Sequence, residues 1–518
     1  MGRINTNVPS LIAQSNLQRS NDDLQIRLER LSTGLRLNRG KDDPAGLIIS
    51  ERIRSDIEGV QQGIKNAERA SSVIATTEGA LAEVGDLLNS VRSLIVESAN
   101  TGGNSAEERA ANQLQIDSAI ESITRIANTA TFGGLKLLDG SQDYILSGVR
   151  SSAITNAQVF SANFVGQNDI QVDVSVLASA QLGALYMSGF NAGTGGQVTS
   201  STTLRIAGSL GVGTIEVVSG TTLANLVAAV NNLTAVTGVS ASLISASDPT
   251  SGIVFNSTEY GSDNFVSVER IGGPSDPAED TVGIYKAADT YQIGAGTGSI
   301  WTEPTAALST SNRDIGRNVT ALVNGTLADS SGLDLSVFSG SISLSLELNE
   351  DLATTLNATS SFNITGGGAL FQLGPEVNAL QQTSIGIQSV ASENLGGTLV
   401  NGAVAYLNSL KSGQDNDIRS SAARGDFSQA SDIIDSSIDE ISIMRGRLGA
   451  FERNTLQTNV RSLQAAFENL SSSSSVIRDA DFAAETSELT RAQILNQAST
   501  SVLGLANQQA QQVLSLLG

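Results

Sequence analysis

The chain of 518 residues contains no cysteine and no histidine, and aromatic residues make up only 4% of it. These absences exclude disulfides, thiolate nucleophiles, imidazole acid–base chemistry and metal sites built from Cys and His. An enzyme made from this sequence would have to work with carboxylates, lysine, tyrosine or serine alone. We therefore expect a protein that is not an enzyme and that holds no catalytic site, cofactor or metal ion.

Membranes and nucleic acids are also unexpected as partners. No run of about 18 apolar residues is present, so no membrane-spanning helix is expected. The first ten residues lack the apolar core of a cleaved secretory signal. The net charge is −22, whereas a protein that binds nucleic acid needs a basic surface to displace counterions from phosphate.

The acidic charge is concentrated in the middle of the chain. Residues 141–400 hold 6 basic and 21 acidic side chains, whereas residues 1–140 hold 15 and 18 and residues 401–518 hold 9 and 13. The two ends can therefore approach each other closely, while the middle stays solvated and repels its own copies. The length of the chain exceeds one compact core, so several domains are expected.

Residues 44–100 carry a helical pattern of unusual length. Apolar residues recur in steps of three, four or seven from Ile49 to Ile95, which is a heptad-like seam that needs partners along one stripe. At 1.5 Å per residue this helix would be a rod of roughly 85 Å. Residues 100–104 end the rod, and residues 106–127 return as a shorter helix.

The residues just before this rod predict a break between two helices. Gly34 and Gly40 end a first, shorter helix, and Asp43 and Pro44 are the N-cap and first residue of the next one. Asp42 and Asp43 could instead form a carboxylate pair for acid–base chemistry, but helix capping explains them more simply. We expect the two helices to pack against different neighbours.

The middle zone, about residues 140–390, is predicted to be rich in β-strands. Gly, Ser, Thr and Asn are frequent between stretches in which apolar and polar residues alternate. One helix is expected at residues 223–233, and Trp301, the single tryptophan, is expected to fill a small core. The clearest strands are predicted at residues 169–176, 203–206 and 341–348.

Two short motifs could suggest ligands but have simpler interpretations. Gly366–Gly368 lacks the Lys-Ser/Thr pair of a phosphate-binding loop and is interpreted as a turn. Asp415-Asn-Asp417 is only a fragment of a calcium-binding loop and is interpreted as a solvated loop.

The helical pattern resumes from about residue 395. A second long seam runs from Ile434 to Leu470, with one stutter near residues 451–456. The serine run 471–475 and the residues up to Asp481 are expected to interrupt it before a final helix. The two ends mirror each other, and neither long seam is stable alone. The predicted fold class is a multidomain α+β protein, in which both chain ends form a long antiparallel coiled-coil-like rod with a β-rich insert at its tip.

Motifs in both helical ends stand in an order and spacing typical of a known family. They are Arg3-Ile-Asn-Thr-Asn7, Leu31-Ser-Thr-Gly-Leu-Arg-Leu-Asn38, Lys41-Asp-Asp-Pro-Ala-Gly46, Ser98-Ala-Asn100, Phe132-Gly-Gly-Leu-Lys-Leu-Leu138, Ile477-Arg-Asp-Ala-Asp481 and Val513-Leu-Ser-Leu-Leu517. On these residues the chain resembles the bacterial flagellins. The insert also resembles a small strand–helix module of that family around residues 228–231 and 237–239.

The resemblance implies a structural subunit that polymerises into the extracellular bacterial flagellar filament for swimming motility. The termini would form the inner core, and the acidic insert would face outward. The implied partners are other copies of the chain, the flagellar export apparatus, an export chaperone bound through the C-terminal helix, and the hook-associated junction and cap proteins. The implied location is secreted, in the extracellular flagellum.

The resemblance also implies a division of the chain into segments. They are an N-terminal inner-tube helix (1–42), N-terminal rod helices and a hairpin (43–185), a β-rich outer insert (186–385) with a strand–helix module near 200–272, a C-terminal rod helix (386–476) and a C-terminal inner-tube helix (477–518).

Subunit contacts are expected along the apolar stripes of the helical ends. The expected interface residues are Ile4, Val8, Leu11, Leu28, Leu31, Leu35, Arg36, Ile49, Ile53, Ile57, Val60, Leu88, Val91, Leu94, Leu463, Phe467, Ile494, Leu495, Val502, Leu503, Val513, Leu514 and Leu517. Two alternatives remain open at this point. One is a hook-associated junction protein with the same helical ends, and the other is a surface adhesin that binds through its insert.

Overall fold

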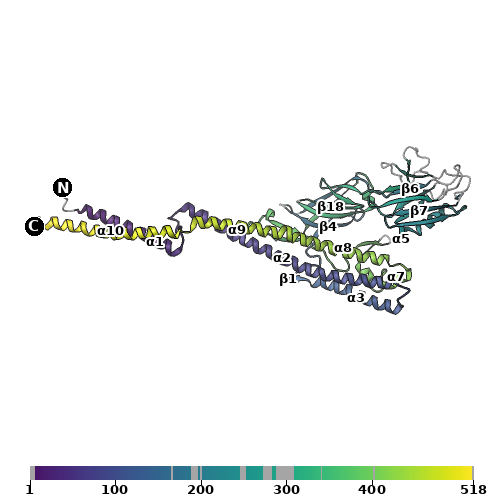
Figure 1. Cartoon of the computed structure of the whole chain (residues 1–518), viewed down its shortest axis with the longest axis horizontal. Coiled ribbons are helices and arrows are strands. Elements are labelled where there is room, and N and C mark those ends of the chain that lie inside the picture. Colours follow the sequence, from purple (N-terminus) through teal and green to yellow (C-terminus); the bar gives the residue numbers. More distant parts are fainter. Residues whose placement is uncertain are drawn as a thin grey trace. The chain divides into compact units, whose positions relative to one another are not determined.

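The structure is a computed structural model of the chain (Figure 1). It describes residues 6–164, 167, 169–187, 197–198, 201–244, 252–271, 283–287, 308–339, 341–400 and 403–515, so Trp301 lies outside the described residues. The chain forms two compact units: residues 1–115, 371–383 and 416–518 make the first, and residues 116–370 and 384–415 make the second. The first unit is helical and the second is rich in strands, which confirms an α+β protein with helical termini and a β-rich insert.

Unit 1 is built from long helices that come from both ends of the chain. They are α1 (Val8–Thr33), α2 (Pro44–Ala99), the first part of α3 (Ala106–Thr129), α7 (Ile418–Arg424), α8 (Ser428–Phe451), α9 (Gln457–Arg478) and α10 (Phe482–Ser515). Helix α1 packs along α10, and α2 packs along α8 and α9 (Figure 1). The prediction that the break gives α1 and α2 different neighbours is confirmed.

The break between α1 and α2 is made by local backbone chemistry. Gly34 follows the last turn of α1 with φ 72°, a left-handed conformation that glycine adopts without strain. Asp43 Oδ1 accepts a hydrogen bond from the Gly46 N–H at 2.9 Å and caps α2. Asp42 Oδ2 accepts from the Arg39 N–H at 2.9 Å, and this bond lowers the pKa of Asp42. The two carboxylates thus cap and turn the backbone, as predicted.

The two breaks in the helical ends lie side by side and pair with each other. Leu35 and Asp479 form an isolated antiparallel β-bridge. Three hydrogen bonds accompany it: Arg36 N–H to the Arg478 carbonyl at 2.7 Å, Ala480 N–H to the Gly34 carbonyl at 2.9 Å, and Arg36 Nη2 to the Ile477 carbonyl at 2.8 Å. We call residues 34–36 and 478–480 the joint. The backbone groups that the helix ends leave free are therefore satisfied by the opposite chain end.

The predicted stutter near residues 451–456 is a π-helical segment, η6 (Glu452–Leu456), between α8 and α9. A π turn accommodates one extra residue in a helix. The buried seam therefore continues from Leu448 on α8 through Leu456 to Leu463 on α9. The expected interruption at the serine run 471–475 is wrong, because these residues are helical and α9 continues to Arg478.

Unit 2 contains two antiparallel β-sandwiches. In the first, sheets β16-β15-β5-β20-β3 and β17-β18-β19-β4 share one hydrophobic core. In the second, sheets β13-β12-β6-β10-β9 and β14-β11-β7-β8 enclose another core together with helix α4. Strand β19 shows the alternation that the sequence predicted, because its residues from Ile342 to Leu348 are buried at every second position.

The elements of unit 2 have the following bounds. The first sandwich contains β3 (Tyr144–Ser147), β4 (Ile154–Ala162), β5 (Ile170–Ala178), β15 (Thr320–Val323), β16 (Thr326–Leu327), β17 (Asp329–Ser331), β18 (Asp334–Phe338), β19 (Ile342–Leu348), α6 (Glu350–Ala353) and β20 (Thr359–Gly367). The second contains β6 (Ala184–Met187), β7 (Thr202–Gly208), β8 (Val212–Val217), α4 (Leu223–Asn231), α5 (Thr234–Thr237), β9 (Val239–Leu243), β10 (Ile253–Ser257), β11 (Phe265–Ile271), β12 (Ile284–Ala287), β13 (Leu308–Thr310) and β14 (Arg313–Ile315). The remaining elements are β1 (Thr131–Phe132), β2 (Leu135–Lys136), β23 (Thr398–Val400), β24 (Ala403–Ala405) and η5 (Leu407–Leu410).

Several expected limits fall inside these elements. The limit at 185/186 cuts strand β6, and the first sandwich already begins with Tyr144, because its strands come from both sides of the second sandwich in the sequence. The limit at 476/477 lies inside α9, two residues before the joint. The motif at Asp415–Asp417 is not a solvated loop throughout, since Asp417 is buried and its carboxylate caps α7 by accepting from the Ser420 N–H at 2.6 Å.

Asp334 and Glu347 form a like-charged pair in the first sandwich. They stand directly opposite each other on β18 and β19. Although Asp334 is exposed at the surface and Glu347 is half-buried, partial loss of hydration raises the pKa of both carboxyl groups, and the charge of Asp334 raises the pKa of Glu347 further. Both groups therefore bind a proton more tightly in the folded than in the unfolded chain. Their ionisation at a pH above the raised pKa values destabilises the fold.

Replacing Glu347→Gln is expected to stabilise unit 2 by roughly 0.2–1 kcal/mol at about pH 7, since it removes one of two like charges on neighbouring strands. The gain should shrink as the pH falls through the raised pKa of Glu347, because protonation then neutralises the wild-type side chain as well. Calorimetric unfolding of the full chain at about pH 7 and about pH 4 measures both effects. Glu216→Gln is the control, because Glu216 faces the neutral Thr203. A gain of equal size at both pH values would contradict this explanation.

Candidate functional site

The paired helices α1 and α10 meet along small and polar side chains. The buried residues on this seam are Ala13 on α1 and Glu485, Ala492 and Ala506 on α10, with exposed fractions of 8% or less. Polar side chains of the two helices also hydrogen-bond across the seam. The contacts are Asn7 Nδ2 to the Ala506 carbonyl at 3.2 Å, Ser10 Oγ to Asn507 Oδ1 at 2.8 Å, Asn496 to Asn21, and Arg27 Nη1 to Glu485 Oε1 at 3.2 Å. Small residues let the two backbones approach closely but bury little apolar surface.

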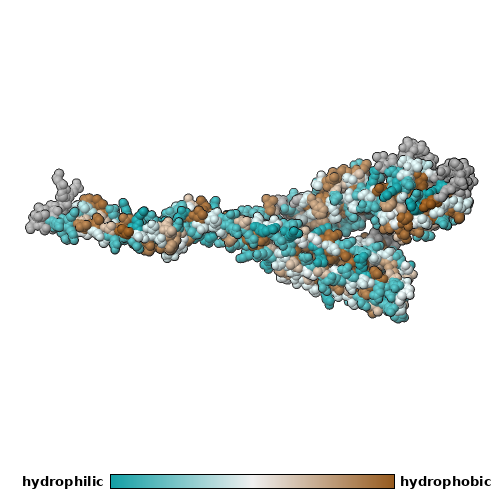
Figure 2. Space-filling model, viewed as in Figure 1, coloured by the Kyte–Doolittle hydropathy of each residue, from teal (hydrophilic) through white to brown (hydrophobic). Residues whose placement is uncertain are grey.

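Many large apolar side chains of these two helices point away from the seam. On α1 the exposed ones are Val8, Leu11, Ile12 and Leu28, with exposed fractions of 43–57%. On α10 they are Phe482, Ile494, Leu495, Val502 and Leu505, with exposed fractions of 51–68%. Figure 2 shows hydrophobic patches among hydrophilic residues along the paired terminal helices. The pair therefore carries an apolar surface that a single chain leaves in contact with water.

The structure divides the expected interface residues into groups. Those exposed on the helices are Val8, Leu11, Leu28, Arg36, Ile49, Ile494, Leu495 and Val502. Those partly buried are Leu31, Leu35, Ile53, Ile57, Leu94, Phe467 and Leu503. Ile4 and Leu517 lie outside the described residues, and Val513 and Leu514 belong to α10.

Four of the expected residues are part of the core within one chain. They are Val60, Leu88, Val91 and Leu463, with exposed fractions of 8% or less. Helix α2 packs along α8 and α9, so its heptad-like seam finds its partner in the same chain. Apolar periodicity predicts that a stripe is covered but does not say whether the cover comes from the same chain or from another copy.

Sequence reasoning missed a second exposed feature, the segment of residues 371–383. It joins β21 (Ala369–Gln372) to β22 (Gln382–Ile385) and contains the short helix η4 (Ala379–Gln381). Val377 and Leu380 in this segment are 87% and 82% exposed. No periodic pattern marks them, because they stand in a connecting loop.

Two glycines on α2 allow this segment to lie close to the helix, because a side chain at either position would leave too little room. A Cβ at Gly59 would stand 2.9 Å from Cβ of Pro375, and one at Gly63 would stand 3.0 Å from the Leu373 carbonyl oxygen. The spacing of four residues puts both glycines on one face of α2. Side chains also fix the loop itself. Gln372 Nε2 donates to the carbonyls of Gly374 and Glu376 at 3.0 and 2.7 Å, and Gln381 Oε1 accepts from the Glu376 N–H at 2.6 Å.

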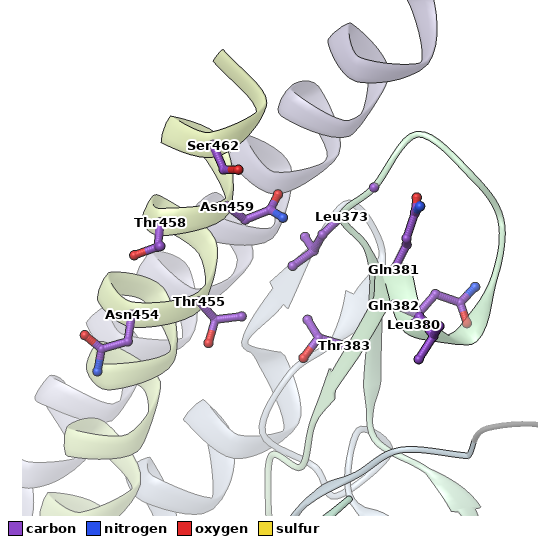
Figure 3. Close-up of a pocket in the computed structure, with 11 residues that line it drawn as sticks. Leu373, Leu380, Gln381, Gln382, Thr383, Asn454, Thr455, Thr458, Asn459 and Ser462 are labelled. Atoms are coloured by element: carbon purple, nitrogen blue, oxygen red, sulfur yellow. The ribbon is translucent and has the colours of Figure 1, made fainter. Parts of the chain in front are cut away.

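A cavity of about 480 Å³ lies between this segment and the helical residues 454–462 (Figure 3). Most of the side chains that line it are polar, and Leu373 and Leu380 are apolar. The polar ones are Gln381, Gln382, Thr383, Asn454, Thr455, Thr458, Asn459 and Ser462. None of these side chains is ionisable, so the cavity suits a neutral partner that hydrogen-bonds. The buried Oδ1 of Asn459 has no hydrogen-bond partner among the described residues.

A cluster of charged contacts lies where α1 meets the start of α10. Arg27 donates to Asp23 within α1 at 3.2 Å and to Glu485 on α10 at 3.2 Å. Although partial burial lowers the pKa of Arg27, the two carboxylates raise it above its usual value. Arg30 approaches Glu485 Oε1 to 4.0 Å. Glu485 is therefore a buried carboxylate held by two cations.

The described helices contain no segment that is long and apolar enough to cross a membrane. The geometry defines a class of architecture, in which paired terminal helices carry an exposed apolar surface and a β-rich insert interrupts the sequence between them.

Comparison with known proteins identifies the family. Residues 4–143 match the bacterial flagellin N-terminal helical region, residues 431–517 match the bacterial flagellin C-terminal helical region, and residues 203–259 match the flagellin hook IN motif. The chain is 30% identical to flagellin of Salmonella typhimurium, 30% to B-type flagellin of Pseudomonas aeruginosa and 30% to flagellin of Escherichia coli, in each case over 99% of both chains. The chain belongs to the bacterial flagellin family.

Among solved structures, the chain is similar to flagellar hook associated protein-3 from Legionella pneumophila, with 12% identity, a TM-score of 0.29, and coverage of 82% of this chain and 97% of that one. The predicted role as a structural subunit of the flagellar filament is confirmed by the matches to the flagellins.

Proposed function

We propose that the chain polymerises through the exposed apolar surface of α1 and α10, which other copies of the same chain cover in the filament. The observation that carries this proposal is the exposed apolar surface of the helix pair: the buried residues of the seam are small or polar, leucines such as Leu24 and Leu489 are only partly buried, and Leu11, Ile494 and other large apolar residues face outward. Because these side chains are already about half covered, covering the rest of each contributes about 1–2 kcal/mol. In a single chain these side chains stay in water and the stabilisation is not realised, whereas in a tube of many copies neighbouring subunits cover them.

A second contact between copies is proposed at residues 371–383. Val377 and Leu380 are more than four-fifths exposed on a loop that its own hydrogen bonds hold in place. A preorganised apolar loop loses little conformational entropy when another surface covers it. The neutral hydrogen-bonding cavity beside the loop suits the same partner, since a neighbouring copy brings both apolar side chains and amide groups.

The acidic insert is proposed to face outward from such a filament. Residues 141–400 hold 21 acidic against 6 basic side chains, so copies of this region repel one another and stay in water. An outer position also leaves the near-neutral helical ends free to pack in the interior. The role proposed is structural rather than catalytic, as the family indicates.

The finer partners implied by the family are proposals as well. They are an export apparatus and a chaperone that binds the C-terminal helix before export, and junction and cap proteins at the ends of the filament. Secretion to the extracellular flagellum follows from this role. The exposed apolar face of α10 supports the chaperone in particular, because an unassembled subunit needs that face covered.

Electron microscopy of concentrated protein, precipitated with salt, tests polymerisation directly. We expect long filaments of uniform diameter, whose mass consists of this chain alone. A protein that stays monomeric at every concentration, with or without filament seeds, would contradict the proposal.

A further inference from the structure

Two short segments carry the chain between the two sandwiches of unit 2. Residues 179–183 lead from β5 of the first sandwich to β6 of the second, and residues 316–319 lead back from β14 to β15. The two segments pair with each other, because Gln181 and Arg317 form an isolated antiparallel β-bridge. The Gln181 N–H donates to the Arg317 carbonyl at 3.0 Å, and the Arg317 N–H donates to the Gln181 carbonyl at 2.8 Å. The connection is thus a short two-stranded ribbon, which could still bend if nothing else joined the sandwiches.

A loop of the second sandwich lies beside this ribbon. Residues 258–264 connect β10 to β11, and they contact the turn between β17 and β18 of the first sandwich. A Cβ at Gly261 in this loop would stand 2.7 Å from Cα of Gly332 in that turn, and one at Gly316 in the ribbon would stand 2.5 Å from the Gly261 carbonyl oxygen. Backbones can approach this closely only where no side chain intervenes. We call the place where ribbon, loop and turn meet the sandwich contact.

The side chain of Asn318 in the ribbon binds both the loop and the turn. Its Oδ1 accepts one hydrogen bond from the Ser262 N–H in the loop at 2.8 Å and another from the Gly332 N–H in the turn at 3.0 Å. Its Nδ2 donates to the Ser330 carbonyl on β17 at 2.9 Å. The amide oxygen therefore uses both of its lone pairs, one for each sandwich. If the sandwiches moved apart, at least one of these backbone donors would lose its partner.

Tyr260 adds a second side-chain contact between the sandwiches. It belongs to the loop of the second sandwich, yet its ring packs against the hydrophobic core of the first. Its hydroxyl donates to a carboxylate oxygen of Glu350 on α6. Loss of hydration, together with the hydrogen bond to Glu350 and the charge of that carboxylate, raises the pKa of Tyr260, so the phenol keeps the proton that it donates.

We infer that the two sandwiches of unit 2 form one rigid body, and that Asn318 and Tyr260 hold the sandwich contact closed. Bending the ribbon would have to break the hydrogen bonds of both side chains at the same time, since both join the loop of the second sandwich to the first. Domains connected without such contacts move relative to each other by default. The orientation of the second sandwich on the first is then built into the single chain and does not depend on polymerisation.

The absence of cysteine makes a direct test possible, because nitroxide spin labels then attach only to introduced cysteines. The pair Ser147→Cys with Thr214→Cys places one label on each sandwich, at exposed positions of β3 and β8. Two further pairs report on the single sandwiches: Ser147→Cys with Thr326→Cys on the first, and Thr214→Cys with Ser242→Cys on the second. Pulsed electron paramagnetic resonance of dilute full-length chain measures the distribution of distances for each pair. In the parent protein, the pair that spans the sandwich contact is expected to give a distribution as narrow as the other two.

Adding Asn318→Ala with Tyr260→Phe removes the side-chain hydrogen bonds across the sandwich contact and keeps the aromatic ring. This double variant is expected to widen the distribution of the spanning pair about two-fold or more and to leave the other two pairs unchanged. The matched control is Asn231→Ala with Thr234→Val. It removes side-chain hydrogen bonds of the same kind, to Ala241 at 2.7 and 3.0 Å and to the Val239 carbonyl at 2.9 Å, but all of them lie within the second sandwich. It should leave the spanning pair unchanged.

A wide distribution of the spanning pair in the parent protein would overturn the inference that the sandwiches form one rigid body. An unchanged width in the Asn318→Ala, Tyr260→Phe chain would refute the role of these two side chains. Widening of a pair within one sandwich would refute it as well, because the two residues would then support the fold of that sandwich and not its contact with the other.

Discussion

Deletion of residues 485–518 is expected to abolish filament formation completely while unit 2 remains folded. The deletion removes almost all of α10, including Glu485 and the exposed Ile494, Leu495 and Val502. Helix α1 then loses its partner, and both its seam and its outward apolar residues are left in water. The two sandwiches of unit 2 draw their cores from residues 144–364 and are unaffected.

Sedimentation and electron microscopy measure polymer formation of the truncated chain, and calorimetry measures the unfolding transition of unit 2. The full-length chain is treated in parallel as the control. Filaments formed by the truncated chain would show that α10 is dispensable for assembly. A lost transition of unit 2 would show that the two units depend on each other for stability.

Placing charge on the outward face of α10 is the second change with a large expected effect. Ile494 and Val502 are 62% and 53% exposed and lie eight residues apart, so both stand on nearly the same face of the helix. Because about half of each side chain is already covered in the single chain, the double variant Ile494→Asp with Val502→Asp forfeits about 2–3 kcal/mol of apolar burial in the polymer. The subunit concentration needed for polymerisation should therefore rise by roughly 30-fold or more.

The same substitutions should leave the fold of the single chain unchanged, because both side chains face water there. Turbidity against protein concentration measures the critical concentration, and circular dichroism measures the helical content. The control carries two aspartates on exposed strand positions of unit 2, Thr214→Asp with Thr326→Asp, and so has the same net charge. If the control impaired polymerisation equally, charge alone and not the apolar face of α10 would explain the loss.

The helical part of the fold could be predicted because its signals are local. The cap at Asp43, the helix end at Gly34 and the stutter near residues 451–456 each act within one or two turns, and each is found where the sequence placed it. The serine run 471–475 misled the prediction. Serine has only a modest helix penalty, and here Ser473 Oγ donates to the Asn469 carbonyl at 2.8 Å inside a continuous helix.

The arrangement of the strands could not be predicted in the same way. Alternation located β5, β7 and β19, but which strands pair is decided by contacts between residues far apart in the sequence. In the first sandwich β4 pairs with β19, although all strands of the second sandwich lie between these two in the sequence. The local pattern of β4 does not indicate that it pairs with β19, and the reverse is also true. The domain limit expected at residue 185 therefore fell inside the β-rich unit.

For the candidate site, periodicity identified apolar stripes but not what covers them. Val60 and Val91 on α2 are covered by the same chain, whereas Ile494 on α10 is not, and all three stand in similar patterns. The exposed residues Val377 and Leu380 escaped prediction altogether. They stand on a loop that lies close to Gly59 and Gly63 on α2, which are distant from it in the sequence.

The joint at residues 34–36 and 478–480 has a mechanical consequence. Residues 34–36 connect α1 to α2, and residues 478–480 connect α9 to α10. Because these two segments are hydrogen-bonded to each other, the adjoining ends of α1 and α10 are held together at the joint. A change of backbone angle in only one of these two segments would break the hydrogen bonds between them, so α1 and α10 must change their angle together. A subunit can then tilt its terminal pair against its long helices to follow a curved filament without parting the two chain ends.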